Sequence, residues 1–456
     1  MAKSLLQKFA ESPAALLGRT IDGSARLHSG LQHLYPLRKA GEYWHLLGPG
    51  LTTGAADDDP SGIATYSQTG SQYGFQLLWL AAFTFPLMAV VQEMCARIGL
   101  VTGRGLAANI RHHYPKWVLY SCTSLLIVAN TFNIGADLGA MAKAIQLLIP
   151  NAPFGLLVVG LTFLIVGLLI YSSYRKYARF LKILALVLLS YIASSFLSHL
   201  DWTQVLRNSV VPSLNFSKDQ LFLICAILGT TISPYLFFWQ TSQEVEEKIA
   251  VGQTTLAQRR QASSHEEIRN MRTDVWSGMF LSNLVMFFII AATAGTLYAH
   301  GITNVATAAD AAEALRPFAG NASYLLFTLG IIGTGMLAIP VLAGSSSYAV
   351  AESFGWKSGL DYKLNKALAF YGIVILSMLI GLAMNFIGLD PLKALIYSAV
   401  ANGIVAPAIL VMIILLASSK KVMGQHKNSE LSTALGWIIT GVMAVAGAAA
   451  IYSLFG

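Results

Sequence analysis

Residues 48–74 read GPGLTTGAADDDPSGIATYSQTGSQYG, and this stretch decides the fold. It lies in the first long apolar segment, yet it places Asp57, Asp58 and Asp59 in a row directly before Pro60. Each aspartate at the centre of a bilayer costs roughly 2.5 to 3.5 kcal/mol on insertion scales. Proline removes a helical hydrogen bond and disfavours the α conformation at the preceding residue. The stretch therefore predicts a broken membrane helix whose carboxylates are compensated by a bound cation.

A second interruption lies in the sixth apolar segment, where residues 223–247 read LICAILGTTISPYLFFWQTSQEVEE. Thr230, Ser233 and Pro234 break the apolar run near its middle, 174 residues after the first proline. A single proline kink can serve packing alone, because neighbouring groups re-satisfy the backbone. Two kinks at corresponding positions, one beside three aspartates, are instead typical of secondary transporters built from inverted repeats. In these, freed carbonyl groups and nearby side chains coordinate ions near the bilayer midplane.

The composition places the chain in a membrane. Its 456 residues are 55% hydrophobic and 11% charged, with a mean hydropathy of +0.60, whereas soluble domains average about 25% charged residues. A helix needs about 20 mostly apolar residues to cross the bilayer. Eleven segments meet this need, at residues 45–69, 75–99, 117–147, 154–173, 179–199, 218–242, 272–299, 322–350, 365–386, 391–417 and 434–455.

We therefore expect an all-α integral membrane protein with about 11 transmembrane helices, of which the first and sixth are broken. Residues 1–43 form a polar N-terminal tail, and the transmembrane domain follows from residue 44 to residue 456. Within it, five-helix repeats cover about 44–200 and about 218–417, and an extra helix covers about 434–455. Five spans are an odd number, so the two repeats have opposite topology.

The positive charge of the chain is interpreted as a topology signal. A formal net charge of +8 would by itself also suit a nucleic-acid partner. However, 25 of the 30 Lys and Arg residues lie in the N-terminal tail or in loops on the same side as that tail. Cytoplasmic loops carry such an excess. We expect a multi-pass protein of the cell (inner) membrane, with a cytoplasmic N-terminus, an external C-terminus and no nucleic-acid partner.

The cysteines give no sign of a structural metal or a disulfide. Cys95, Cys122 and Cys225 lie in apolar segments without a CxxC pairing, so neither a disulfide framework nor a zinc site is indicated. We expect no resident cofactor, no enzymatic activity and no obligate protein partner. The partners are the lipid bilayer and the transported ion.

Three stretches resemble the natural resistance-associated macrophage protein (Nramp) family of divalent-metal transporters. They are the first span, GSQYG at residues 70–74, and LMAVVQEMCARIGLVTGRGLA at residues 87–107. The resemblance runs from about Gly48 to the end of the tenth span and includes GLDPLKALIYSAV at residues 388–400 and the serines 345–347. It implies a LeuT-type fold with two five-helix inverted repeats and transport of divalent metal ions.

The chain departs from the family's motif in the first span. The family carries DPGN there, and the matching residues are Asp59, Pro60, Ser61 and Gly62. The acidic ligand is kept and the asparagine ligand is lost.

The sixth span departs further. The family's Met-Pro-His is matched by Ser233, Pro234 and Tyr235, and Gln240 stands where a second histidine is common. Thioether sulfur favours softer transition metals, whereas carboxylate, hydroxyl, carbonyl and water suit Mg²⁺ and Mn²⁺. Mg²⁺ also retains water readily, so it fits a site with few carboxylates and room for water. The chain resembles the Nramp-related magnesium transporter branch, which implies Mg²⁺ as substrate with Mn²⁺ as a second one.

The resemblance also assigns ligands. It implies that the Asp59 carboxylate and the Ala56 carbonyl bind the ion from one side and that the Thr230 carbonyl and the Ser233 hydroxyl face them. We expect Asp58 to be the second carboxylate. Successive helical residues turn by about 100°, so three aspartates point at one ion only if the helix is unwound. Asp57 either binds the ion or lines an aqueous vestibule. The ion path is expected to include Asp57, Gly62, Tyr235, Gln240, Asp137 and Asn402.

Proton coupling is expected to be weak or absent. Related transporters use histidines of the sixth span and acids of the third span, and here only Asp137 of the third-span acids remains. Tyrosine and glutamine do not titrate near neutrality as histidine does. Asn130 and Asn133 are alternatively placed to hydrogen-bond Asp137 and tie the third helix into the bundle. Asn402 either faces the ion path or makes an interhelical hydrogen bond.

Four other functions compete with this interpretation. The first is a proton-coupled Mn²⁺/Fe²⁺ transporter of the usual Nramp type. The second is a sodium-coupled amino-acid symporter on the same fold, which three carboxylates beside the break disfavour because they would repel a substrate carboxylate. An intramembrane aspartyl enzyme lacks a matched second motif. An ion channel has a similar sequence signature, and flux saturation distinguishes it from a carrier.

Overall fold

A computed structural model describes residues 48–171, 186–198, 200–261, 264–305, 307–360 and 362–455. The predicted tail, residues 1–43, lies outside this part. The described residues form helices joined by turns and contain no β-strand, as expected for an all-α membrane protein. From Pro49 onward the chain forms one compact unit.

Both predicted helix breaks are present. The first separates α4 (Pro49–Asp57) from α5 (Pro60–Tyr73), and the second separates α13 (Lys218–Thr231) from α14 (Pro234–Ala250). In each pair the proline opens the second helix, where its missing N–H and fixed φ are tolerated. The residue before each proline is extended, with ψ of 172° at Asp59 and 131° at Ser233. Proline thus ends one helix and starts the next at both positions.

The other predicted spans coincide with helices or parts of helices. They are α6 (Trp79–Thr102), α8 (Lys116–Leu148), α9 (Phe154–Tyr171), α11 (Ser190–Leu197) after the 3-10 turn η1 (Leu186–Leu189), α16 (His265–Thr296), α19 (Ser323–Phe354), α20 (Leu368–Met384), α21 (Pro391–Ser418) and α23 (Glu430–Phe455). Within the described residues, eight helical stretches are long and apolar enough to cross a membrane. The broken first helix and α20 are shorter, and residues 179–185 of the predicted fifth span lie outside the described residues, so length alone does not reproduce the predicted count of eleven.

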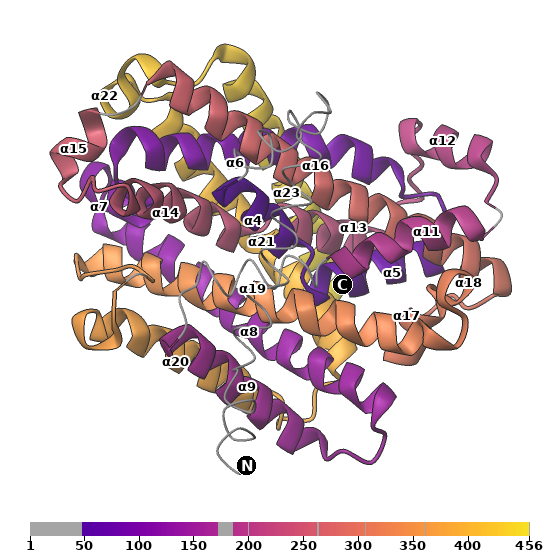
Figure 1. The fold of residues 1–456 in the computed structure, drawn as a ribbon. Helices are drawn as coiled ribbons and strands as arrows, with labels where there is room; N and C mark the ends of the chain where they lie inside the picture. The colour runs from indigo at the N-terminus through magenta and orange to yellow at the C-terminus, as the bar shows by residue number, and fades with distance from the viewer. Residues whose placement is uncertain are drawn as a thin grey trace, which may run out of the picture. The chain divides into compact units, whose positions relative to one another are not determined.

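Short helices lie at the two ends of the bundle. In Figure 1, α7 (Leu106–His113), α15 (Leu256–Gln261) and α22 (Lys420–Met423) lie at the left end, and α12 (Trp202–Val210) and α18 (Arg316–Ala319) lie at the right end. The remaining short elements are α17 (Ala308–Glu313), η2 (Tyr298–His300), η3 (Gly320–Ala322), η4 (Leu364–Lys366) and η5 (Gly424–His426). The polar segment 242–270 includes the end of α14, then α15 and the start of α16.

Glycines let the helices around the two breaks approach closely. A Cβ on Gly54 of α4 would lie 2.3 Å from the carbonyl oxygen of Gly278 in α16, and a Cβ on Gly229 of α13 would lie 2.0 Å from the Ala399 oxygen in α21. Small residues are typical of such interfaces in membranes. In Figure 1 the broken helices lie inside the bundle between α6 and α16 on one side and α19 and α8 on the other.

Candidate metal-binding site

Asp59 is fixed at the start of α5. Its side chain caps the helix: Oδ1 accepts from the Gly62 N–H at 2.8 Å and from the Ser61 hydroxyl at 2.6 Å. Its Oδ2 accepts from Asn133 Nδ2 of α8 at 2.8 Å. The residue is 1% exposed. A carboxylate at a helix N-terminus is stabilised by the free N–H groups and the helix dipole, which lowers the cost of burying the charge.

Asp57 and Asp58 face a different helix. The Ser282 hydroxyl of α16 lies 2.5 Å from Asp57 Oδ2 and 3.3 Å from Asp58 Oδ1. A hydroxyl has one proton, so it donates to one carboxylate at a time, and Asp57 is the closer acceptor. Asp57 is fully buried and its Oδ1 has no partner among the described residues. In this conformation Asp57 therefore does not line an exposed vestibule.

The break separates the three carboxylates into two groups. Asp59 points toward α8, whereas Asp57 and Asp58 share a donor on α16. Across the described part of the chain, no group of three or more Asp, Glu, His or Cys side chains is placed to hold a metal ion. A cation bound at the break would therefore need backbone carbonyls, hydroxyls or water in addition to carboxylates.

The two prolines each free one backbone carbonyl. In an α-helix the carbonyl of residue i accepts from the N–H of residue i+4, and proline has no N–H. Pro60 therefore leaves the Ala56 carbonyl without its helical partner. Pro234 does the same to the Thr230 carbonyl, because the spacing is again four residues. These are the two carbonyls that the family resemblance assigned as ligands.

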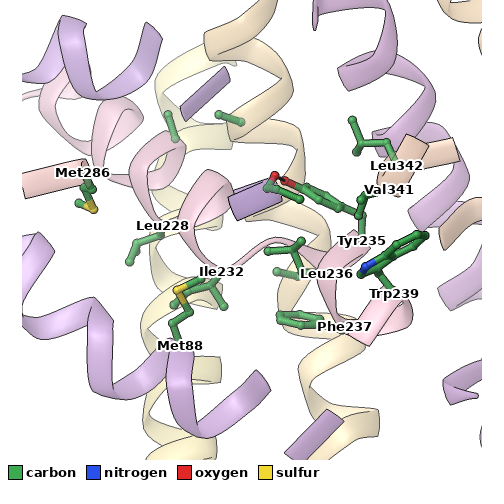
Figure 2. Close-up of a cluster of buried hydrophobic side chains, with 14 of the residues drawn as sticks. Met88, Leu228, Ile232, Tyr235, Leu236, Phe237, Trp239, Met286, Val341 and Leu342 are labelled. Carbon is green, nitrogen blue, oxygen red and sulfur yellow. Dashed lines mark hydrogen bonds between the residues drawn. The ribbon is translucent and has the colours of Figure 1, made fainter. Parts of the chain in front are cut away.

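In the structure, hydroxyl groups satisfy both freed carbonyls. The Tyr235 hydroxyl donates to the Ala56 oxygen at 3.1 Å, across from one break to the other. The Ser233 hydroxyl lies 2.7 Å from the Thr230 oxygen and 2.8 Å from the Gly229 oxygen, and its single proton is donated to one of them at a time. Figure 2 shows Tyr235 just after the second break, among apolar side chains that include Leu236 of α14 and Leu342 of α19. Two of the expected protein ligands are thus occupied by internal hydrogen bonds.

The two breaks lie next to each other. The Ser61 hydroxyl is 3.3 Å from the Thr230 hydroxyl. A Cβ on Gly62 would lie 3.2 Å from the same Thr230 hydroxyl and 3.3 Å from the Tyr66 ring. The Tyr66 hydroxyl in turn lies 3.1 Å from the Thr231 hydroxyl. Glycine at position 62, where the family carries asparagine, therefore keeps this contact free of a side chain.

Asn133 connects Asp59 to Asp137 along α8. Its Nδ2 is 2.8 Å from Asp59 Oδ2 and 3.5 Å from Asp137 Oδ2. Asp137 is fully buried, and its Oδ1 has no partner among the described residues. Asn130 instead donates to the Leu342 carbonyl of α19 at 3.0 Å. Asn133 therefore makes the expected contact with Asp137, at the limit of a hydrogen bond. The same prediction for Asn130 was wrong.

Gln240 belongs to a polar chain that leads away from the break. Its Oε1 accepts from the Thr53 hydroxyl at 2.5 Å, and its Nε2 donates to Glu244 Oε1 at 2.9 Å. Gln240 and Thr53 are fully buried, and Glu244 is nearly so. This chain links α4 to the far half of α14.

Asn402 is buried with no partner for its side chain. It is 1% exposed, and neither amide atom has a hydrogen-bond partner among the described residues. The alternative interhelical hydrogen bond is therefore not formed. The following residue, Gly403, packs against Gly229, since a Cβ on Gly229 would lie 2.4 Å from the Gly403 nitrogen. Asn402 thus lies on α21 close to the second break with its donor and acceptor unused.

Sequence reasoning missed Ser282 and the contact between Asn133 and Asp59. Ser282 and Asn283 are adjacent polar residues within the apolar run of α16, which was an available signal. The Asn133 contact joins residues 74 positions apart and depends on how α8 packs against α5.

Comparison with known proteins decides the family. The family model described as natural resistance-associated macrophage protein-like (Nramp) matches residues 50–453, which is most of the chain and includes both breaks. The chain belongs to this family.

Among its relatives is the divalent metal cation transporter MntH of Klebsiella pneumoniae. It is 25% identical over 401 residues, covering 87% of this chain and 91% of the relative. Among solved structures, the manganese transporter of Eremococcus coleocola has a TM-score of 0.68 at 20% identity, covering 88% and 84% of the two chains. The nucleobase-cation-symport-1 family transporter Mhp1 has a TM-score of 0.57 at 15% identity, covering 89% and 91%. This Nramp-family chain therefore has the LeuT-type fold of a multi-pass membrane protein.

Proposed function

We propose that this Nramp-family protein carries divalent metal cations, Mg²⁺ and Mn²⁺, into the cell by alternating access between its two repeats. The observation that supports the proposal is the pairing of the breaks: the Ser61 hydroxyl, which donates to Asp59, lies 3.3 Å from the Thr230 hydroxyl of the second break. Its relatives include proteins named as a divalent metal cation transporter and a manganese transporter. A binding site at paired helix breaks is the arrangement that secondary transporters use.

In the proposed site, Asp59 is the first ligand and Asp58 the second carboxylate. The entering ion takes the place of the hydroxyl protons at the Ala56 and Thr230 carbonyls, and the Ser233 oxygen turns toward the ion. Asn402 supplies an amide oxygen from α21 or orients a retained water. Every one of these ligand atoms is an oxygen.

An oxygen-only ligand set supports Mg²⁺ as a substrate. Mg²⁺ and Mn²⁺ prefer carboxylate, carbonyl and water ligands, whereas thioether sulfur selects softer metals. Ser233 stands where relatives carry methionine, so the soft ligand is absent from that position. Mg²⁺ also keeps several waters in its protein sites, so a site with few protein ligands suits it.

We further propose weak or absent proton coupling. Tyr235 and Gln240 occupy the positions at which relatives carry histidines, and both side chains are committed to hydrogen bonds with α4. Neither has the near-neutral titration that makes histidine a proton carrier.

One observation favours the second candidate, a proton-coupled Mn²⁺/Fe²⁺ transporter. Asp137 is buried and reaches Asp59 through Asn133, so a carboxyl group that can hold a proton lies one side chain from the ion site. Measured proton movement separates the two candidates.

The decisive experiment is metal influx into proteoliposomes for Mg²⁺, Mn²⁺ and Ca²⁺, with the internal pH recorded at the same time. Wild type is compared with Asp59→Ala and with Asp59→Asn, since asparagine retains an oxygen to cap α5. Asp390→Asn is the matched control, because Asp390 is an exposed carboxylate that caps α21. We expect influx to be lost in both Asp59 variants and kept in the control.

Two results would contradict the proposals. Unchanged influx in Asp59→Asn and Asp59→Ala would remove the site at the break. Internal acidification that requires the metal would overturn weak coupling and support the second candidate. The orientation, with the N-terminus in the cytoplasm and the C-terminus outside, rests on the distribution of Lys and Arg and is tested by labelling cysteines introduced into the loops.

A further inference from the structure

An apolar groove of about 270 Å³ lies between α8 and α21 on the outside of the bundle. Leu125, Val128 and Phe132 line it from α8, and Ala401 and Val405 line it from α21. Val128 is 71% exposed. An exposed apolar groove on a membrane-spanning helix pair faces the hydrocarbon of the bilayer, so an acyl chain is the natural occupant.

The helices that line the groove also carry residues of the candidate metal site. Phe132 precedes Asn133, which binds Asp59, and Ala401 precedes Asn402, whose side chain is unpartnered. The two helices that form the groove are therefore also helices that carry polar groups of the site.

Basic side chains gather where these two helices meet the membrane surface. His112 and His113 end α7, and their rings are 4.9 Å apart. Lys116 begins α8, nine residues or roughly 13 Å along the helix from Leu125. α7 and α22, which contains Lys421, both pack against α21. Burial lowers the pKa of His113, and the nearby charges of His112, Lys421 and two arginines lower it further. Basic side chains therefore surround His113, whose own ring is favoured in the neutral form and can donate a hydrogen bond.

The two segments that carry this cluster contain no acidic residue to neutralise it. The chain has no Asp or Glu between Glu93 and Asp137, and none between Asp390 and Glu430. Trp117 beside Lys116 is 72% exposed, and exposed tryptophan is enriched at the level of lipid headgroups. The cluster therefore carries an excess of positive charge at headgroup level, and a carboxylate from another helix, Glu352 of α19, accepts a hydrogen bond from the Ala108 N–H of α7.

We propose that an anionic phospholipid binds here, with its phosphate among Lys116, His113 and Lys421 and one acyl chain in the groove between α8 and α21. A lipid satisfies both halves of the site, because its headgroup complements the charge and its chain fills the apolar groove. Under the proposed orientation this lipid belongs to the cytoplasmic leaflet. The assignment does not depend on which ion is transported.

The test is native mass spectrometry of the purified full-length protein with equal amounts of phosphatidylglycerol and phosphatidylcholine added. We expect wild type to retain phosphatidylglycerol preferentially. Lys116→Gln combined with Lys421→Gln is expected to lower that retention by about fivefold for each lysine. The matched control combines Lys393→Gln and Lys218→Gln, two exposed lysines that begin α21 and α13.

A second pair of variants tests the groove. Val128→Trp puts a large side chain at the groove, and Leu164→Trp puts the same side chain on α9, where Leu164 is 50% exposed. We expect only Val128→Trp to reduce phosphatidylglycerol retention. Equal retention of the two lipids by wild type would overturn the proposal, as would an equal loss in the control lysine pair. Inorganic phosphate that displaces phosphatidylglycerol, with no effect of Val128→Trp, would overturn it in favour of a soluble anion.

Discussion

Replacing Tyr235 by phenylalanine tests whether the Ala56 carbonyl is a cation ligand. Pro60 removes the helical partner of that carbonyl, and the Tyr235 hydroxyl donates to it at 3.1 Å. Tyr235→Phe leaves a buried carbonyl unsatisfied, which costs about 1 to 3 kcal/mol. A cation that binds the carbonyl removes this penalty. The variant is therefore expected to bind Mn²⁺ at least about fivefold more tightly than wild type, since 1.4 kcal/mol corresponds to tenfold in Kd.

The assay is isothermal titration calorimetry of Mn²⁺ binding in nanodiscs, with thermal unfolding of the metal-free protein measured alongside. Tyr66→Phe is the matched control, because Tyr66 is equally buried and its hydroxyl pairs with the Thr231 hydroxyl at 3.1 Å, which is not an expected ligand. We expect the control to lose stability without a gain in affinity. An unchanged Kd in Tyr235→Phe, together with reduced stability of the metal-free protein, would refute the role of the Ala56 carbonyl. Weaker binding would instead make the Tyr235 hydroxyl itself a ligand.

Three further predictions concern stability and selectivity. Asp274→Asn weakens the cap that accepts two N–H groups at the start of α4. Thermal unfolding is expected to show a loss of up to about 2 kcal/mol of unfolding free energy, while the Mn²⁺ affinity stays unchanged. Gly54→Ala drives a methyl group to 2.3 Å from the Gly278 oxygen and is expected to destabilise by about 1 to 3 kcal/mol, whereas Gly167→Ala, with open space around it, is not. Ser233→Met introduces a thioether and is expected to shift influx from Mg²⁺ toward Mn²⁺; an unchanged ratio would remove Ser233 from the ligand set.

The helix breaks were predictable because proline acts locally. Pro60 and Pro234 each determine where one helix ends and which carbonyl four residues earlier is freed, and both consequences follow from the sequence without knowledge of packing. The acidic character of the first break was equally visible, since aspartates within an apolar segment require compensation.

The partners of the carboxylates were not predictable in the same way. Ser282 binds Asp57 and Asn133 binds Asp59 only because α16 and α8 pack on opposite sides of the break. Helix rotation and depth in a membrane bundle depend on close contacts such as that between Gly54 and Gly278, and one sequence does not specify them. Whether Asp57 lines an aqueous vestibule could not be predicted either, because the exposure of its side chain depends on the conformation of the bundle.

The carbonyls and the carboxylates at the breaks differ in how far their hydrogen-bonding capacity is used. The two freed carbonyls are already satisfied by the hydroxyls of Tyr235 and Ser233, so an entering ion exchanges these bonds for coordination and gains little from them. The carboxylates differ: Asp57 and Asp137 each keep a buried oxygen without a partner among the described residues, and no Lys or Arg in that part of the chain pairs with them. We therefore propose that the carboxylates supply the attraction for a divalent cation and that the carbonyls and Ser233 select among cations.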